Sequence, residues 1–186
     1  MSNNLEIKYD LSGLKAISAR MRAASHQSPV AVRLAVKHTG GKATVAVRKA
    51  LVGQTGLKRK VLDRAVKGRS VAAGYEIKSR GGNISLKHFG ARETRNGVSA
   101  APWGSRRIYP GTFIKGGKFP SRVTLKMNGQ VFERTGGRRF PIRKVKSGLF
   151  IPVEMVKGQS EAAFFAVVER DLPARLEHEL ARILGG

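Results

Sequence analysis

The change from helical to strand periodicity falls in residues 69–86, which read RSVAAGYEIKSRGGNISL. Before the glycine pair, apolar residues recur at every second position: Val71, Ala73, Tyr75 and Ile77. This two-residue period is typical of a β-strand. Gly81-Gly82-Asn83 predicts a turn, after which Ile84 and Leu86 continue the alternation. We therefore expect a β-hairpin across these residues.

Four more strand candidates follow the hairpin, at residues 97–101, 106–109, 122–127 and 130–134. The last two are joined by Asn128-Gly129, the strongest short hairpin signal that a sequence offers. Such short connections make neighbouring strands antiparallel. Residues 68–148 are therefore predicted to form a central antiparallel β-sheet.

The N-terminal part, residues 1–67, has helical spacing instead. After Asp10, a candidate N-cap, one apolar stripe consists of Leu11, Leu14, Ile17, Met21 and Ala24. Ser28-Pro29 predicts a second helix start. A second stripe follows it, comprising Ala31, Leu34, Ala35 and His38, then Val45, Ala46 and Leu51. Gly40-Gly41 interrupts this stripe, so the pattern fits one long weakened helix or two helices hinged at the glycines.

A third, shorter helix is predicted at residues 57–66, capped by Thr55-Gly56. Its first turn carries Lys58, Arg59 and Lys60, although cations at a helix N-terminus oppose the helix dipole. We interpret this placement as a sign that the three side chains act outside the helix.

The C-terminal part, residues 149–186, is helical again. Its apolar stripe comprises Ala162, Phe165, Ala166, Val168, Leu172, Leu176, Leu180 and Ile183, and the acids are expected on its other faces. Pro173 should kink this helix or divide it after Leu172. The order of helices, sheet and helix predicts one α+β domain over residues 1–186.

Charge is distributed unevenly along the chain, whose net charge is +24. Residues 11–153 hold 31 Lys and Arg but only four acids, whereas residues 159–186 hold five acids and three arginines. Such a positive field attracts polyphosphate and predicts salt-dependent binding to an anionic polymer. The alternatives are a merely soluble basic surface or a ribosomal-type RNA binder.

Signals for other classes of protein are missing from the sequence. There is no cysteine, no signal peptide pattern and no apolar run long enough for a membrane span, so we expect a protein made in the cytosol with no membrane partner. The four histidines, His26, His38, His88 and His178, show no metal-ligand spacing, and His38 is expected to be partly buried. No acid–base pair or nucleophile motif occurs. We expect no catalytic residue, no metal and no cofactor, and therefore no enzyme.

A run of short motifs occupies residues 89–142. In order, the run contains Phe89, Gly90, Arg92, Trp103, Gly104, Tyr109, Pro110, Gly111, Phe113, Val131, Phe132, Arg134 and Pro141. Taken singly, the aromatic residues would be core, the glycines turns and the arginines solvated. We expect Trp103, Phe113, Val131 and Phe132 in the core of the sheet.

Taken together and in this order, the run resembles the minor tail protein Z family of long-tailed bacteriophages and prophages, also called tail completion proteins. The resemblance covers about residues 30–155 and includes Thr55-Gly56-Leu57-Lys58. The chain departs from the family pattern at Gly40-Gly41 and at Leu149-Phe150-Ile151-Pro152.

The resemblance implies a non-enzymatic virion component at the head-proximal end of the tail, present in the host cytoplasm during assembly. It also implies a homo-oligomeric ring of six copies. Its neighbours would be the tail terminator, the tail tube and the head–tail connector, and genomic DNA would pass through it.

Three basic clusters are the predicted phosphate contacts, without sequence preference. They comprise Lys58, Arg59 and Lys60; Arg106 and Arg107; and Arg138, Arg139, Arg143 and Lys144. We expect them to converge on the surface that faces the central opening. Two alternatives stay open: a cellular nucleic-acid-binding protein of ribosomal or nucleoid type, and a basic surface that docks on an acidic protein.

Overall fold

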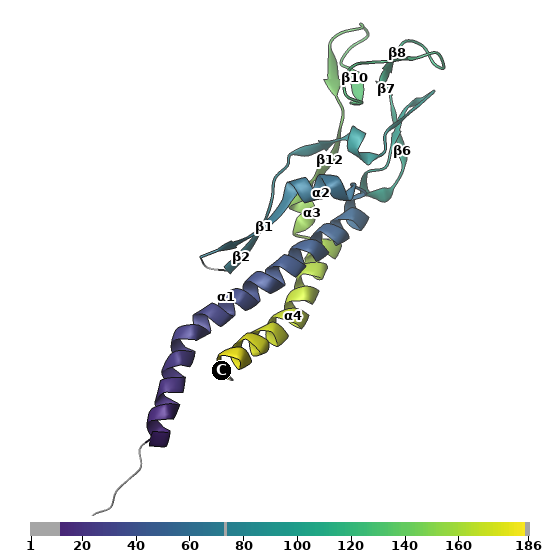
Figure 1. The fold of residues 1–186 in the computed structure, drawn as a ribbon. Coiled ribbons are helices and arrows are strands. Elements are labelled where there is room, and N and C mark those ends of the chain that lie inside the picture. The colour runs from purple at the N-terminus through teal and green to yellow at the C-terminus, as the bar shows by residue number, and fades with distance from the viewer. Residues whose placement is uncertain (1–11, 73, 185–186) are drawn as a thin grey trace, which may run out of the picture.

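One long helix organises the molecule. The computed structural model describes residues 12–72 and 74–184, and within the first helix it describes side chains from Ser28 onward. Helix α1 (Ser12–Thr55) has 44 residues and is therefore about 66 Å long. It runs between the last helix, α4 (Gly158–Leu184), and a β-hairpin, and the small sheets lie beyond its C-terminal end (Figure 1). The α+β class predicted from the sequence is confirmed.

Helix α1 is continuous, so the predicted restart at Ser28-Pro29 is wrong and the one-helix alternative at Gly40-Gly41 is correct. The helix passes through Pro29 although proline cannot donate the usual backbone hydrogen bond. Gly40 is not a hinge, because a Cβ at this position would lie 2.2 Å from Cγ of Tyr75. The glycine makes room for an aromatic ring of the hairpin.

The buried side of α1 consists of small residues at four-residue steps, and the first predicted stripe lies outside the described side chains. The buried positions at this spacing are Ala31, Ala35, Thr39, Ala43, Val47, Leu51 and Thr55, and Thr44 beside them is buried as well. His38, expected to be partly buried, is exposed. Gly56, with φ of 72°, ends α1 instead of capping the next helix, because this left-handed conformation suits the residue after a helix. Helix α2 (Arg59–Ala65) then begins after Lys58.

Within residues 12–72 and 74–184 the strands form five small antiparallel sheets in place of the single predicted sheet. Their neighbours are β1–β2, β12–β3, β4–β5–β6, β8–β9 and β11–β10–β7. The bounds are β1 Val66–Val71, β2 Gly74–Ser79, β3 Asn83–Ser85, β4 Arg92–Thr94, β5 Gly97–Ala100, β6 Arg107–Pro110, β7 Thr112–Phe113, β8 Lys115–Gly116, β9 Val123–Thr124, β10 Phe132–Arg134, β11 Ile142–Lys144 and β12 Lys146–Phe150. Two 3₁₀ turns, η1 (Leu86–Phe89) and η2 (Pro102–Gly104), and the short helix α3 (Ile151–Met155) complete the chain.

Both predicted hairpins differ from the structure in their pairing. In the first, β1 pairs with β2 and β3 pairs instead with β12, while Ala73 lies outside the described residues. Asn128 and Gly129 do have the positive φ of a tight hairpin turn, 54° and 63°. However, β9 pairs with β8, while β10 pairs with β7 and β11. Tertiary packing decides which strand β10 pairs with, since Phe132 of β10 lies opposite Phe113 of β7 in the register and their ring centroids are 6.2 Å apart.

The hydrophobic core lies where the C-terminal half of α1 meets α2 and the sheets. Its buried residues are Val47, Leu51, Leu57, Leu62, Val66, Leu86, Phe89, Val98, Ala100, Val131, Leu149 and Ile151. Phe132 is also buried and Phe113 is half-buried. Trp103 is 40% exposed, so its predicted place in the core is wrong.

Helix α4 is not divided at Pro173, and the predicted stripe describes its packing only in part. Phe165 is 51% exposed, and Ala162 and Ala166 are exposed too. Two of its acids lie on the side that α1 covers: Asp171 pairs with Lys42 of α1 at 3.2 Å, and Glu179 is buried. Both acids have cationic partners there: Lys42 of α1 pairs with Asp171, whereas Arg175 and Arg182 of α4 itself pair with Glu179. Over the described part of the chain, no helix has the length and apolar character needed to span a membrane.

Candidate nucleic-acid interface

The first predicted cluster lies at the start of α2. Lys58 precedes the helix and makes no capping hydrogen bond through its side chain. Arg59 donates from Nε to Oδ1 of Asp63 at 2.8 Å, one turn along the same helix. Lys58, Arg59 and Lys60 are all exposed. This cluster therefore keeps two cations for a partner and shares the third with Asp63.

The second predicted cluster is divided by strand geometry, because neighbouring residues of an extended chain point to opposite sides. Arg106 donates to Oγ of Ser99 at 3.1 Å and to the carbonyl of Gly90 at 3.3 Å. Arg107 donates to the hydroxyl of Tyr109 at 2.7 Å and stacks on its ring. Arg107 thus has its contacts within β6, whereas Arg106, just before β6, contacts Ser99 of β5 and Gly90.

The third predicted cluster lies at the end of the molecule farthest from α4, around the β10–β11 connection (Figure 1). Arg143 pairs with Glu133 at 2.5 Å, and Arg139 stacks on Phe140. Arg138 and Lys144 are exposed. Among the described residues, no hydrogen bond or ion pair links the three clusters, which follow the long axis from α2 to this end. Convergence around a ring opening stays a prediction.

A denser basic surface lies on the β1–β2 hairpin, and the sequence analysis did not identify it. The inner face of the hairpin packs on α1: a Cβ at Gly68 would lie 2.4 Å from Oγ1 of Thr44, and Arg48 donates to the carbonyl of Val66 at 2.6 Å. The residues that alternate with these inner ones along the two strands form the outer face of the hairpin. There the antiparallel register places Lys67 opposite Lys78 and Arg69 opposite Glu76. The backbone NH of Arg80 donates to the carbonyl of Ala65, and this hydrogen bond continues the pairing of β1 with β2 by one residue on each side.

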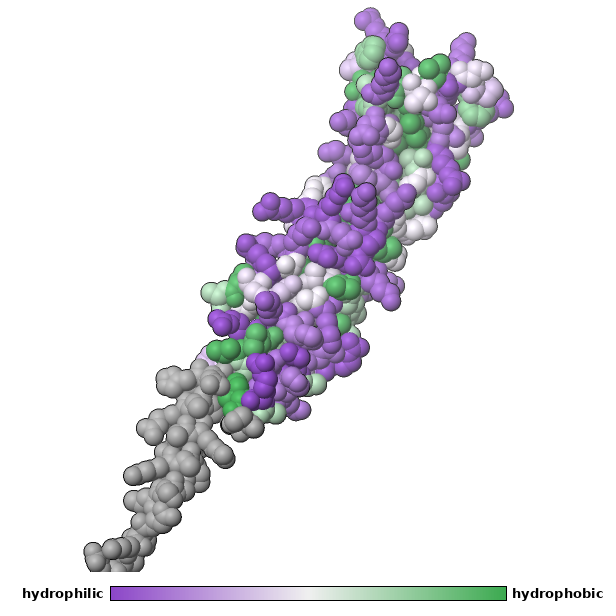
Figure 2. Space-filling view, viewed as in Figure 1, coloured by the Kyte–Doolittle hydropathy of each residue, from purple (hydrophilic) through white to green (hydrophobic). Residues whose placement is uncertain are grey.

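The outer face encloses a hollow with a volume of about 320 Å³, here called the hairpin hollow. It is lined by Arg64, Ala65, Lys67, Arg69, Lys78 and Arg80. The middle of the molecule, where α2 and the hairpin lie, is strongly hydrophilic in the space-filling view (Figure 2). Five of the six lining residues are cations and none is an acid.

Glu76 is the one acid that contacts this set among the described residues. It pairs with Lys78 at 2.8 Å and with Arg69 at 3.1 Å. The hydrogen bond from Lys78, followed by that from Arg69, lowers the pKa of Glu76 below its ordinary value. Arg64, Lys67 and Arg80 make no ion pair with any described residue. The hollow therefore keeps a large positive excess.

A second basic hollow, here called the distal hollow, lies between β4–β5 and β7–β8 and has a volume of about 270 Å³. Its cations are Arg95, Lys115, Arg122 and Arg134. Glu93 pairs with Arg122 and also accepts hydrogen bonds from the backbone NH of Ile114 at 2.8 Å and of Lys115 at 3.1 Å. Arg134 stacks on Phe113. Arg95 and Lys115 make no ion pair with a described residue, so the distal hollow also keeps positive charge, but less than the hairpin hollow does.

Some residues of the motif run at 89–142 are buried in the core, and others lie at the surface. Phe89, Val131 and Phe132 are buried. Gly90, Gly104 and Gly111 have positive φ, between 62° and 74°, a conformation that favours glycine. Tyr109 is half-buried, whereas Arg92, Pro110, Arg134 and Pro141 are exposed. Most of the run therefore serves the fold of the small sheets.

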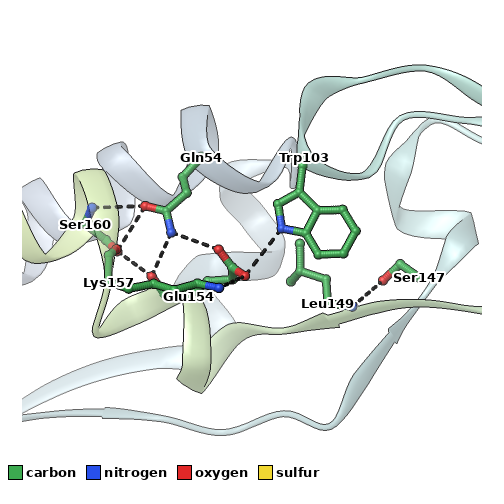
Figure 3. A network of polar contacts seen from close by, with 7 residues as sticks. All are labelled: Gln54, Trp103, Ser147, Leu149, Glu154, Lys157 and Ser160. Atoms are coloured by element: carbon green, nitrogen blue, oxygen red, sulfur yellow. Dashed lines mark hydrogen bonds and ion pairs between the residues drawn. The ribbon is translucent and has the colours of Figure 1, made fainter.

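Trp103 takes part in a polar junction instead of the core (Figure 3). Its indole Nε1 donates to Oε1 of Glu154 at 3.3 Å, and Glu154 is only 4% exposed. Gln54, near the end of α1, donates to Oε2 of Glu154 at 2.8 Å, and Lys157 pairs with Oε1 at 2.9 Å. Burial opposes ionisation of Glu154, but these hydrogen bonds outweigh it and lower its pKa. The backbone NH of Ser160 donates to Oε1 of the Gln54 side chain at 3.1 Å, so the junction fastens α1 to the start of α4.

The described residues contain no group of three His, Asp or Glu side chains placed to share a metal ion. The candidate interface is thus the hairpin hollow together with the exposed cations of the predicted clusters. Comparison of the chain with protein-family models, curated proteins and solved structures found no significant match.

Proposed function

We propose that this chain is a structural, non-enzymatic virion protein of a long-tailed phage or prophage. It acts as a tail completion or neck component at the head-proximal end of the tail. The observation that carries the proposal is the ordered run of motifs between Phe89 and Pro141, which resembles the minor tail protein Z family. In this role several copies form a ring, with six as the expected number.

The surface of the chain supports an assembled role. Several large apolar residues are exposed, among them Phe150, Val153, Val156 and Phe165 around α3 and the start of α4. Neighbouring copies or tail proteins would cover such surface.

The charge supports contact with the genome. Phosphate contacts hold a nucleic acid without reading its sequence, which suits a protein through which any part of a genome can pass. The hairpin hollow and the exposed clusters supply lysines and arginines for this purpose. The tail terminator, the tail tube and the head–tail connector are the proposed protein neighbours.

The test is to locate the chain in assembled particles. An epitope-tagged copy should co-purify with virions, and cryo-EM of those particles should place it as a ring at the head-proximal end of the tail. A strain in which the gene is deleted should accumulate heads and unjoined tails, and expression of the chain in trans should restore joining. A tagged chain found on ribosomes or nucleoid, and absent from purified particles, would instead favour the cellular nucleic-acid-binding protein.

A further inference from the structure

We propose that the hairpin hollow is the site at which this protein holds neighbouring phosphates of a nucleic-acid backbone. The inference rests on the proposed contact with genomic DNA and assigns it to particular residues. These residues are Arg64 at the end of α2, Lys67 and Arg69 on β1, and Lys78 and Arg80 at the end of β2.

The first argument is electrostatic. Lys67 stands directly opposite Lys78 in the antiparallel register, and like charges in this position destabilise a β-ladder. Glu76 contacts Arg69 and Lys78 but not Lys67, Arg64 or Arg80. The fold gains little from three more cations around one hollow, since Asp63 attracts Lys67 but forms no ion pair with it. A bound anion would remove the repulsion.

The second argument is chemical. Arginine binds phosphate through two parallel NH groups, and lysine adds a mobile point charge. Residues 67 and 69 lie on one face of a strand about 7 Å apart along the chain, since each residue of a strand advances by about 3.4 Å. The lining therefore offers cations in a row and not at a single point. Such a row suits a chain of phosphates better than one isolated anion.

The third argument separates nucleic acid from an acidic protein. The centre of a protein–protein interface is depleted of charge and enriched in aromatic residues. The hairpin hollow has no aromatic residue in its lining, and its one uncharged residue is Ala65. Interfaces with nucleic acid are, by contrast, polar and strongly positive. No Asn, Gln or aromatic side chain lines the hollow to read or stack on a base, so binding there is independent of sequence.

The experiment compares the full-length chain with two triple variants in a duplex-DNA binding assay over a series of salt concentrations. The test variant is Arg64→Gln, Lys67→Gln and Arg80→Gln. The control variant, Lys118→Gln, Lys126→Gln and Lys146→Gln, removes the same charge from exposed residues outside the hollow. Two unrelated duplex sequences are used with each protein.

The test variant should reduce the slope of log affinity against log salt by about 2 or more, since each lost phosphate contact removes roughly 0.9. The control should reduce it by less than about 1, and both duplexes should behave alike. The thermal midpoint of the test variant should equal or exceed that of wild type, because Lys67 no longer faces Lys78. A merely structural role for these residues would lower it.

The outcomes distinguish this inference from the proposed function. If wild type binds DNA and the slope of log affinity against log salt falls equally in the two variants, the hollow is not the phosphate site. Its charge would then serve an acidic protein. If wild type binds no duplex at low salt, the hollow and the proposed contact with DNA both fail. Placement of the chain in the virion is decided separately by the particle experiment.

Discussion

The hairpin hollow and the distal hollow are lined by similar numbers of cations, but the fold balances them differently. In the distal hollow Glu93 contacts Arg122 and two backbone NH groups, and it is 10% exposed. In the hairpin hollow Glu76 is more exposed and contacts two of the five cations. The comparison teaches that the number of basic residues does not identify a binding surface. What favours the hairpin hollow is the larger set of cations without a partner: Arg64, Lys67 and Arg80 there, against Arg95 and Lys115 in the distal hollow.

The strongest test of this contrast is to remove the acid from each hollow. Glu93→Gln should lower the free energy of unfolding by about 2–4 kcal/mol, because Arg122 then keeps a largely buried charge without its partner. Glu76→Gln should leave the thermal midpoint almost unchanged, since Arg69 and Lys78 are exposed. Chemical denaturation of both variants measures the difference. Equal losses would mean that the two hollows are balanced alike.

A second test concerns the inner face of the hairpin, which packs on α1, and not its charged outer face. Gly40→Ala should cost about 1–3 kcal/mol of stability, because the new Cβ would collide with the Tyr75 ring. Gly41→Ala is the matched control: a Cβ there meets no atom within 4 Å, and alanine should stabilise the helix by up to about 1 kcal/mol. Urea denaturation of the pair decides the point. If both variants gained stability, the Tyr75 ring would not pack against Gly40.

A third test concerns Trp103, which belongs to a junction whose acid is fully partnered. Trp103→Ala should cost about 1–2 kcal/mol, less than for a buried tryptophan, because the ring is partly exposed and loses one hydrogen bond to Glu154. The backbone of Trp103 is left-handed, with φ of 53° and ψ of 30°. Trp103→Gly should therefore be more stable than Trp103→Ala by about 1 kcal/mol. An alanine variant as stable as the glycine variant would contradict this conformation.

The smallest expected effect is a pH dependence at the α1–α4 contact. Hydrogen bonds from Arg170 and then Lys42 lower the pKa of Asp171 from 3.8 to about 2. A lowered folded-state pKa adds stability above 3.8, and that stability is lost as the pH falls towards 2. The difference in thermal midpoint between wild type and Asp171→Asn should therefore shrink over this interval. A difference that stays constant from pH 6 to pH 2 would show that Asp171 makes no such contribution.

The sequence predicted the types of element better than their partners. Helical spacing identified α1, α2 and α4, and alternation identified β2, β5 and β6. Pairing was harder, because it depends on contacts between distant segments. β3 pairs with β12, more than 60 residues away, and no local turn signal could indicate this. Likewise, the reason for Gly40 lies in Tyr75, a residue of another element.

The candidate interface was missed for a geometric reason. The predicted phosphate contacts were basic residues next to each other in the sequence, such as Arg106-Arg107, but neighbours on a strand point in opposite directions. The useful signal was a cation at every second position, at Lys67 and Arg69 and again at Lys78 and Arg80. Recognising it also required the correct turn, since only the observed register aligns the two pairs.

The contact between α1 and α4 has a consequence for synthesis on the ribosome. The two helices are separated by about a hundred residues, which take roughly 5–20 s to translate. Throughout that interval the finished α1 lacks the partner that covers it, and contacts between such distant segments also form slowly. The nascent chain is therefore most open to proteases and to misassociation until its last helix emerges. In a cell that makes many copies at once, emergence of α4 becomes the event that releases subunits for assembly.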